Sequence, residues 1–277
     1  MHAQRRVEQH YAAPDLGERI LGALAEAGHT VRPGELDALP PIDEMHHRGR
    51  EATEELAAMG HWRPGLQVLD AGSGLGGSSR YLAVQHQCQV VGVDLTPDLC
   101  HAASLLSAAL GIERTRFVRA SATRLPVADA TFDVVWTQHA QMNIPDKEAF
   151  YGELARALRP GGQLLFHDVF AGPAGAPHFP VPWADSETIS SLVTPDRVAE
   201  ILRRNGLLQR QWHDRTEVSL QWARKVSTAP PDTDMGSVGS LLMGPTRQTK
   251  MQNLERNLRE RRIVLIQARY DKPLPQP

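Results

Sequence analysis

The sequence predicts an α/β fold built on a doubly wound, mostly parallel sheet. Beyond residue 65, short apolar runs alternate with amphipathic stretches of helical length. The first run leads into a turn that contains Gly72, Gly74 and Gly77, a G-x-G-x-x-G spacing that can join a strand to a helix. The second run ends in a carboxylate, Asp94. A chain of 277 residues is long enough for one large α/β domain and a small cap.

Seven apolar runs bounded by turn residues predict the strands of this sheet. They cover residues 65–72, 88–95, 114–121, 131–140, 163–170, 207–214 and 261–270. Helices are expected from the glycine turn to about residue 85, and over 96–111, 146–162 and 194–206. Thr96 is expected to cap its helix and Pro97 suits the first turn, whereas Pro160-Gly161-Gly162 should stop the helix before it.

The N-terminal region, residues 1–62, is expected to be helical and to lie outside the sheet. Over 15–28, leucine and isoleucine recur on one helical face before a glycine stop. A second helix is expected over 43–60, with Asp43 as a possible N-cap. The sheet is thus predicted to carry a helical N-terminal extension.

This pattern divides the chain into four parts: a helical N-terminal segment (1–62), the sheet core (63–215), a cap insertion (216–261) and the last strand with its tail (262–277). The insertion is too long for a hairpin turn. Its stretch Thr228–Gly239 is rich in Pro, Asp, Gly and Ser, and lies between two expected helices. We interpret this stretch as a lid over the site, and a surface insertion is the alternative.

Composition and charge narrow the classes of function. The chain is 41% hydrophobic and 22% charged, with a net charge of −2, as in an ordinary globular protein. We expect no nucleic-acid partner, because the basic segment Arg256–Arg262 is interpreted as a solvated helix face. Cys88 and Cys100 have the spacing of neither a metal site nor a disulfide framework, so inert core thiols and no metal are expected.

The first residues, MHAQRRVEQHYAAPD, contain no apolar stretch of the kind found in secretion signals. No apolar run approaches the length needed to cross a membrane. We therefore expect a cytoplasmic protein with no membrane partner, and the sequence leaves its oligomeric state open.

The carboxylate of Asp70 discriminates between ligands that a glycine-rich turn can hold. Asp94 does not, because it can accept hydrogen bonds from the ribose of a dinucleotide or of another nucleoside. Asp70 lies two residues before Gly72, where it would repel a pyrophosphate in a poorly screened site. It would attract the ammonium and sulfonium groups of S-adenosylmethionine, whose carboxylate suits the N–H groups at a helix start. A structural carboxylate that accepts loop N–H groups is the alternative.

Three segments resemble the ordered motifs of class I S-adenosylmethionine-dependent methyltransferases: VLDAGSGLGGSSRYLA (68–83), VVGVDL (90–95) and the stretch from ATRLPV to LLFHD (122–168). The resemblance covers residues 65–214. It implies a Rossmann-like, seven-stranded sheet with an antiparallel last strand, and the methyl donor across the ends of the first strands. The cofactor-binding residues that it implies are Asp70, Gly72, Ser73, Gly74, Gly77, Asp94, Leu95, Ser121, Ala122, Thr123 and Gln138.

Within this family, the chain is similar to enzymes that methylate sarcosine and dimethylglycine, tocopherol, and natural-product scaffolds. DEMHHRGREAT (43–53) resembles a segment that helps to close the site, and FPVPWADS (179–186) also looks like theirs. Two positions depart from the pattern. Ser121 stands where an acid usually meets the adenine amino group, although its hydroxyl can accept that bond. Arg48 replaces a small residue and bears on the shape of the substrate entrance.

Methyl transfer from a sulfonium is an in-line displacement, and it is accelerated by orientation of the nucleophile and exclusion of water. A base is needed only when the nucleophile arrives protonated. His139, after the expected fourth strand, and His46, in the N-terminal segment, are the catalytic candidates. The chain has 12 histidines, so a structural or surface role is the alternative for each.

Four further residues are predicted to bind the substrate: Tyr11, His47, His167 and Trp183. The aromatic rings could contact a cationic methyl donor or amine by cation–π interaction. Tyr11 resembles a tyrosine near the start of related enzymes that caps the donor, and His167 ends the expected fifth strand, where ligands collect. Trp136 lies within a strand and is interpreted as a core residue.

The sequence therefore predicts a methyltransferase that acts on a small-molecule acceptor, with an amine nitrogen favoured. Transfer to an oxygen or a carbon of a natural product is the main alternative. An RNA or protein methyltransferase is disfavoured by the charge balance and by QHAQMN (138–143), which lacks the Asn/Asp-Pro-Pro-aromatic pattern. A donor-binding module without turnover and an NAD-dependent reductase are the remaining alternatives.

Overall fold

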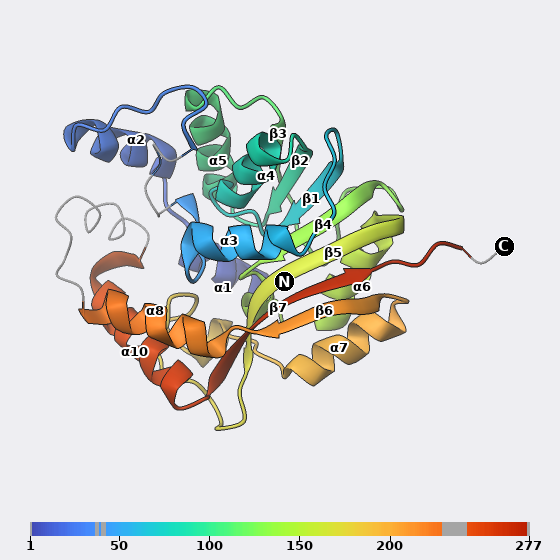
Figure 1. Cartoon of the computed structure of the whole chain (residues 1–277). Helices are drawn as coiled ribbons and strands as arrows, with labels where there is room; N and C mark the ends of the chain where they lie inside the picture. The colour runs from blue at the N-terminus through green and yellow to red at the C-terminus, as the bar shows by residue number, and fades with distance from the viewer. Residues whose placement is uncertain (1, 37–38, 40–42, 229–242, 276–277) are drawn as a thin grey trace.

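The computed structural model describes residues 2–36, 39, 43–228 and 243–275 (Figure 1). Seven strands form one sheet in the order β3-β2-β1-β4-β5-β7-β6. The strands are β1 (Gln67–Ala71), β2 (Gln89–Asp94), β3 (Thr115–Arg119), β4 (Phe132–Gln138), β5 (Leu158–Ala171), β6 (Leu208–Asp214) and β7 (Ile263–Asp271). The α-helices are α1 (His2–Tyr11), α2 (Leu16–Glu26), α3 (Gly49–Ala58), α4 (Gly77–Gln85), α5 (Pro97–Ala109), α6 (Lys147–Ala157), α7 (Pro195–Arg204), α8 (Thr216–Thr228) and α10 (Arg247–Arg259).

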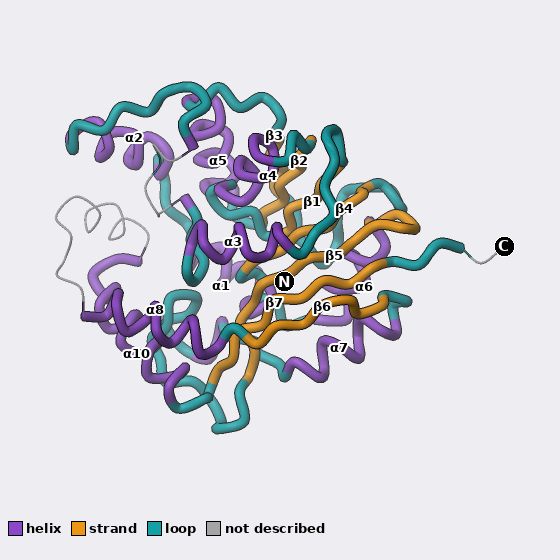
Figure 2. Tube along the Cα trace, viewed as in Figure 1, coloured by secondary structure: helices purple, strands orange, loops and turns teal. Residues whose placement is uncertain are grey.

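Strands β1 to β5 pair in parallel, and β7 runs antiparallel to both β5 and β6. The predicted Rossmann-like sheet with an antiparallel last strand is confirmed. The central strands are buried on both sides, as the near-continuous apolar runs require of a parallel sheet. Figure 2 shows the helices packed around this twisted sheet.

Successive residues of the central strands supply two separate cores, because strand side chains alternate between faces. Val68 of β1 and Val134 of β4 pack in the same cluster as Leu56 of α3 and Leu82 of α4. Their neighbours in the strands, such as Leu69, pack in a second cluster with residues of α6 and α7. The sheet is therefore a rigid middle layer, and its carboxyl edge can hold side chains in fixed positions.

The N-terminal segment is helical, but its last helix begins later than predicted. Residues 43–48 form a loop, and α3 starts only at Gly49. Asp43 does not cap a helix: its carboxylate is buried against the guanidinium of Arg80, which is itself fully buried in α4. An unpaired buried arginine costs more free energy than an uncapped helix end. The ion pair between Asp43 and Arg80 therefore sets the path of this loop.

One further local prediction is wrong, and a second is confirmed in position only. Pro160-Gly161-Gly162 does not end α6, because the helix already stops at Ala157 and these residues lie inside β5, where the pairing with β4 is irregular. Thr96 stands at the N-cap of α5, but its side chain makes no capping bond. Its backbone N–H instead donates to the carboxylate of Asp94.

Residues 216–261, predicted to be a cap insertion, contribute two helices that lie side by side, α8 and α10 (Figure 1). Leu220 of α8 and Leu254 of α10 share an apolar cluster with Leu265 of β7. The predicted lid, Thr228–Gly239, lies outside the described residues except for its first residue. None of the helices in the described ranges is long and apolar enough to cross a membrane.

Replacing Asp43 with alanine should strip Arg80 of its buried counter-charge. Removing one partner of a buried ion pair costs about 3–5 kcal/mol, since the other charge stays desolvated. We expect a correspondingly lower free energy of unfolding in chemical denaturation. Asp129→Ala is the matched control, because Asp129 pairs with Arg156 at the surface, where such pairs contribute little. Equal losses in the two variants would contradict this assignment.

Candidate functional site

A cavity of about 1080 Å³ lies where β1, β2 and β4 end. It is lined from one side by the glycine turn and from the others by α1, the 43–51 segment and the helices of the insertion. Every residue predicted to contact the methyl donor lines it: Asp70, Gly72, Ser73, Gly74, Gly77, Asp94, Leu95, Ser121, Ala122, Thr123 and Gln138. The carboxyl edge of the parallel sheet therefore brings these residues together, as the topology requires.

Two glycines of the turn are needed for space. A Cβ at Gly77 would lie 2.1 Å from the carbonyl oxygen of Asp43, and one at Gly72 would lie 2.5 Å from the Cβ of Ala140. Gly72 also has a φ of 83°, in the left-handed region that favours glycine. The turn is thus held between the N-terminal loop and the segment that follows β4.

Asp94 lines the cavity and also supports the glycine turn by hydrogen bonds. Its carboxylate accepts the N–H of Gly74 at 3.0 Å and that of Thr96 at 2.9 Å. Burial raises the pKa of Asp94, and the hydrogen bonds from the backbone oppose that rise. Asp94 therefore braces the glycine turn from the end of the neighbouring strand.

Asp70 is almost fully buried at the end of β1 and lines the same end of the cavity. One oxygen accepts the hydroxyl of Ser79, at 2.6 Å. Burial raises the pKa of Asp70 to about 7, although the bond from Ser79 and the nearby His46 oppose the rise. A cation bound beside Asp70 would therefore favour its charged form, in agreement with the chemistry inferred from the sequence.

Gln138 has one amide atom left over for a ligand. Its Oε1 accepts the indole N–H of Trp136 at 2.9 Å and the hydroxyl of Ser78 at 2.7 Å. Because an indole nitrogen can only donate, this contact fixes which amide atom is the oxygen. The Nε2 of Gln138 and the Oγ of Ser73 are buried without a partner among the described residues. Both side chains line the cavity and can hydrogen-bond to a polar ligand.

The loop after β3 is covered by the first helix of the chain. Gln4 of α1 donates its side-chain amide to Ser121 at 2.9 Å and to Thr123 at 3.4 Å. Gln4 lines the cavity beside them. Sequence reasoning missed Gln4, because nothing local in α1 indicates a contact with a loop more than one hundred residues away.

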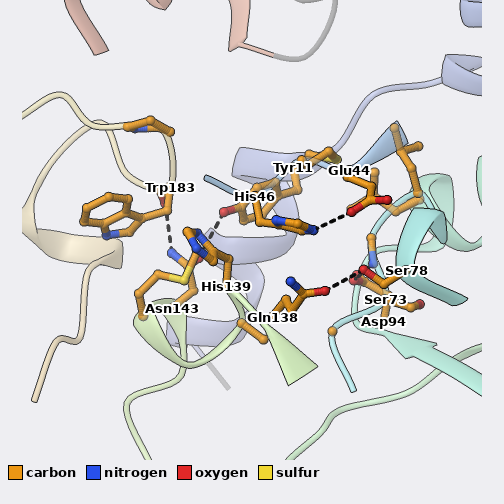
Figure 3. A pocket seen from close by; sticks show the side chains of 18 of the residues that line it. Tyr11, Glu44, His46, Ser73, Ser78, Asp94, Gln138, His139, Asn143 and Trp183 are labelled. Carbon is orange, nitrogen blue, oxygen red and sulfur yellow. Dashed lines mark hydrogen bonds and ion pairs between the residues drawn. The ribbon is translucent and has the colours of Figure 1, made fainter. Parts of the chain in front are cut away.

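The rings of three histidines lie close together, and two of them, His46 and His139, line the cavity. The ring centroids of His46 and His139 lie 5.8 Å apart, and those of His139 and His167 lie 4.9 Å apart. Figure 3 shows His46 and His139 between the donor-side residues, such as Asp94, and Trp183 on the far side. The predicted catalytic pair therefore occupies the middle of one continuous cavity.

His139 is held in a strained and desolvated position. Its φ is 48°, in the left-handed region, and its backbone N–H donates to the carbonyl of His167 at 2.9 Å. Burial, followed by the charges of His46 and His47, lowers the pKa of His139 well below its usual value. Its Nε2 is buried with no partner among the described residues. His139 is thus neutral near pH 7 and has a nitrogen free to exchange a proton.

Glu44 orients the second histidine. Its Oε2 lies 3.1 Å from the Nε2 of His46, and its carboxylate also closely contacts Arg50 and Thr53. Burial opposes ionisation of Glu44, but its bonds and charges with these three partners outweigh burial and lower its pKa to about 2. The ionised carboxylate therefore orients the imidazole of His46 from its Nε2 side. Sequence reasoning missed Glu44, because its neighbourhood was expected to be helical.

His167 does not line the cavity, unlike the other predicted substrate-binding residues. It lies in the middle of β5 and is fully buried, with its ring near those of His139 and His46. Neither of its ring nitrogens has a partner among the described residues. His167 pairs with Gln138 in the sheet, and its predicted contact with a substrate stays a prediction.

Tyr11, His47 and Trp183 take part in hydrogen bonds that connect distant segments of the chain around the cavity. The hydroxyl of Tyr11 donates to Asn143 at 3.0 Å, and the amide of Asn143 donates to the carbonyl of Trp183 at 2.9 Å. The Nε2 of His47 bonds the carbonyl of Ser219 in α8 at 3.0 Å, and burial lowers the pKa of His47 to about 4. All three predicted residues line the cavity.

The two cysteines do not face the cavity, although the thiol of Cys100 donates to the backbone carbonyl of Asp94 at 3.7 Å. Neither Cys88 nor Cys100 lines the cavity, and burial raises the pKa of each thiol to about 11. Within the described ranges, no group of three or more His, Cys, Asp or Glu side chains has an arrangement that could hold a metal ion.

Residues 69–166 match a family model described as a methyltransferase domain. The sarcosine/dimethylglycine N-methyltransferase of Halorhodospira halochloris is 30% identical over 177 residues, which are 64% of this chain and 63% of the relative. A 2-methyl-6-phytyl-1,4-hydroquinone methyltransferase of Synechocystis is 38% identical over 160 residues, 57% and 42% of the two chains. Phosphoethanolamine N-methyltransferase 3 of Arabidopsis thaliana is 35% identical over 126 residues, 45% of this chain. The chain spans only a quarter of that relative.

Solved structures share the fold at low sequence identity. A geranyl diphosphate C-methyltransferase from Streptomyces coelicolor superposes with a TM-score of 0.73 over 98% of both chains, at 16% identity. A phosphoethanolamine N-methyltransferase from Haemonchus contortus gives 0.70 at 18% identity, over 82% of this chain and 54% of its own. The [4+2]-cyclase SpnF gives 0.68 at 18% identity, over 91% and 93%.

The buried carboxylate of Asp70 should make the stability of the ligand-free protein depend on pH. Its pKa is about 7 in the folded state, against an ordinary 3.8, so the folded state binds more protons between these values. Stability from this group is present below pH 3.8 and is lost as pH rises towards 7. Asp70→Asn removes that loss and can still accept the hydroxyl of Ser79.

We therefore expect the unfolding free energy of Asp70→Asn, relative to the unchanged protein, to increase from pH 4 to 7 and to level off above 7. Denaturant titrations at pH 5, 6, 7 and 8 measure this difference. Asp129→Asn is the control, because Asp129 is largely exposed. A difference that stays constant with pH would show that Asp70 is already ionised in the folded state.

Proposed function

We propose that this chain, a member of the class I S-adenosylmethionine-dependent methyltransferases of the small-molecule type, transfers a methyl group from S-adenosylmethionine to a small-molecule acceptor. The observation that carries the proposal is the two-ended cavity. One end presents the glycine turn with Asp70 and Asp94, and His139 and His46 stand where the second end begins.

The donor end has groups that match each polar part of S-adenosylmethionine. Asp94 accepts the ribose hydroxyls and Asp70 balances the ammonium group. The Nε2 of Gln138, which has no partner among the described residues, can donate to the carboxylate. Ser121 lies at the adenine end, under α1. When bound, S-adenosylmethionine supplies a methyl group that its sulfonium has already activated, and S-adenosylhomocysteine remains as the thioether product.

The histidines serve an acceptor that arrives protonated. As the acceptor forms its bond to the methyl carbon and the bond from that carbon to the sulfonium breaks, the proton of the acceptor passes to the imidazole of His139 or of His46. The Nε2 of His139 has no partner among the described residues, and Glu44 holds the ring of His46 in place. The surrounding α1, α8 and α10 exclude water, which favours displacement at a cationic centre.

We propose that the atom that receives the methyl group is a nitrogen. A nitrogen is favoured by the likeness to the sarcosine/dimethylglycine and phosphoethanolamine N-methyltransferases. Oxygen and carbon are the alternatives, in view of tocopherol O-methyltransferase and geranyl diphosphate C-methyltransferase. We also keep a cytoplasmic location, a natural-product acceptor and the four-part division of the chain, with 216–261 as the cap, as predictions.

Transfer of isotope-labelled methyl from S-adenosylmethionine to a mixed panel of amines, phenols and amphipathic acids tests the proposal directly. Mass spectrometry of a labelled product would identify the acceptor atom. Binding of S-adenosylhomocysteine, measured by calorimetry, is the parallel readout. Binding without transfer to the panel or to a cell extract would indicate a donor-binding module, and absence of binding would refute the donor site.

Asp94→Ala should weaken binding of S-adenosylhomocysteine by about tenfold to a hundredfold, because charge-assisted hydrogen bonds to the ribose are lost. Calorimetric titration measures the change. Asp133→Ala is the matched control, since Asp133 also accepts a backbone N–H, from Gln67, but does not line the cavity. An unchanged affinity in Asp94→Ala would overturn the placement of the ribose.

His139→Asn should lower kcat by about a hundredfold to ten thousandfold while leaving the affinity for S-adenosylhomocysteine nearly unchanged. Asparagine is chosen because it tolerates the left-handed backbone at this position. His213→Asn, at an exposed position in β6, is the control. If kcat is unchanged in His139→Asn but falls in His46→Asn, the proton goes to His46, and no change in either variant would mean that the acceptor needs no base.

A further inference from the structure

Beyond the histidines, the cavity is walled by large apolar side chains. They come from the end of β5, the loop after it, the two helices of the insertion and β7: Val169, Trp183, Trp222, Met251, Leu254 and Leu265. Several belong to one buried cluster, so this wall is a fixed part of the fold. Its composition favours an acceptor with an apolar body, because apolar surface gains free energy when it leaves water.

No carboxylate among the described lining residues belongs to this wall. The lining acids lie in the 43–51 segment, at the ends of β1 and β2, and at Asp146, which caps α6. Asp185, next to Trp183, does not line the cavity and is tied to Lys250 at 2.9 Å and to His10 at 3.2 Å. A cationic acceptor would therefore lose its hydration here without gaining a counter-charge.

Arg247 is a cation at this end that lacks a counter-ion among the described residues. It lines the cavity, and its Nε is buried without a hydrogen-bond partner there. Arg48, which also lines the cavity, is paired with Glu51 and Glu55, and Arg50 with Glu44. A guanidinium in this state is a strong site for a carboxylate or a phosphate.

The position of Arg247 relates the charge to the apolar wall. Arg247, Met251 and Leu254 are spaced i, i+4 and i+7 along α10, so that they share one face of the helix, and all three line the cavity. At 1.5 Å per residue this face extends for about 10 Å. An elongated ligand can thus lie along it with one end at the arginine.

From this juxtaposition we propose that the acceptor is amphipathic: its apolar body lies along the α10 face, and one anionic group, a carboxylate or a phosphate, binds Arg247. The inference rests on the proposed function for the identity of the site, because it names the class of molecule that receives the methyl group. It sets the acceptor apart from small zwitterionic amines such as dimethylglycine, which offer no apolar body for this wall.

Binding of simple probes tests the inference without turnover. The protein is saturated with S-adenosylhomocysteine and titrated by calorimetry with dodecanoate, dodecyl phosphate, dodecanol and dimethylglycine. We expect dodecanoate or dodecyl phosphate to bind at least tenfold more tightly than dodecanol, and dimethylglycine not to bind. The preferred anion then distinguishes a carboxylate from a phosphate acceptor. Equal affinity for dodecanol would overturn the role of the anion, and preferential binding of dimethylglycine would overturn the whole inference.

Two variants separate the charge from the apolar wall. Arg247→Gln should weaken the anionic probe by about tenfold to a hundredfold and leave dodecanol unchanged. Leu254→Asp should weaken both probes. Arg259→Gln, on the same helix but away from the cavity, is the control, and unchanged binding of S-adenosylhomocysteine verifies that each variant is folded. Equal binding of the anionic probe to Arg247→Gln and Arg259→Gln would refute the assignment of Arg247.

The probe measurements are independent of the proposed activity. A protein that binds the anionic probe through Arg247, but transfers no labelled methyl group to any acceptor, would refute the methyltransferase proposal and keep the binding inference. A protein that methylates a small hydrophilic amine, and ignores the amphipathic probes, would refute the inference and keep the proposed function.

Discussion

The site depends on the close approach of the 43–48 loop to the glycine turn. The carbonyl oxygen of Asp43 occupies the space that a side chain at position 77 would need, and the carboxylate of Asp43 neutralises the buried Arg80. This contact fixes a loop that has no regular hydrogen-bond ladder of its own. Glu44 and His46 follow directly along the chain. The contact between the 43–48 loop and the glycine turn therefore also sets their positions in the cavity.

The cavity contains two kinds of electrostatic environment. The donor end holds Asp70 and Asp94, whose burial favours their protonated forms until a cation arrives. The acceptor end is apolar and carries the charge of Arg247. The two histidines stand at the boundary between these environments, where the methyl group would pass. A cation is thus favoured on one side of the boundary and an anion on the other.

The sequence could predict the sheet and the donor end, because both follow from short-range patterns. Apolar runs mark the strands, and parallel strands bring Asp70, Asp94 and Gln138 to one edge. It could not predict contacts between distant segments that override local signals. Asp43 looked like a helix cap but serves Arg80, and neither Gln4 nor Glu44 carries a local mark of its partner. His167 lies in the predicted strand, but it is fully buried beside His139 and is not among the residues that line the cavity.

The fold alone does not identify the acceptor, because the family model matches only part of the cavity lining. The residues of the glycine turn, Asp94 and His139 fall within 69–166, the stretch that matches the methyltransferase domain. Arg247, Met251 and Leu254 of α10 fall outside it and line the far wall of the cavity. A C-methyltransferase, an N-methyltransferase and a [4+2]-cyclase, which differ in their reactions, share this fold. Under the proposed function, the side chains of this wall would then select the acceptor.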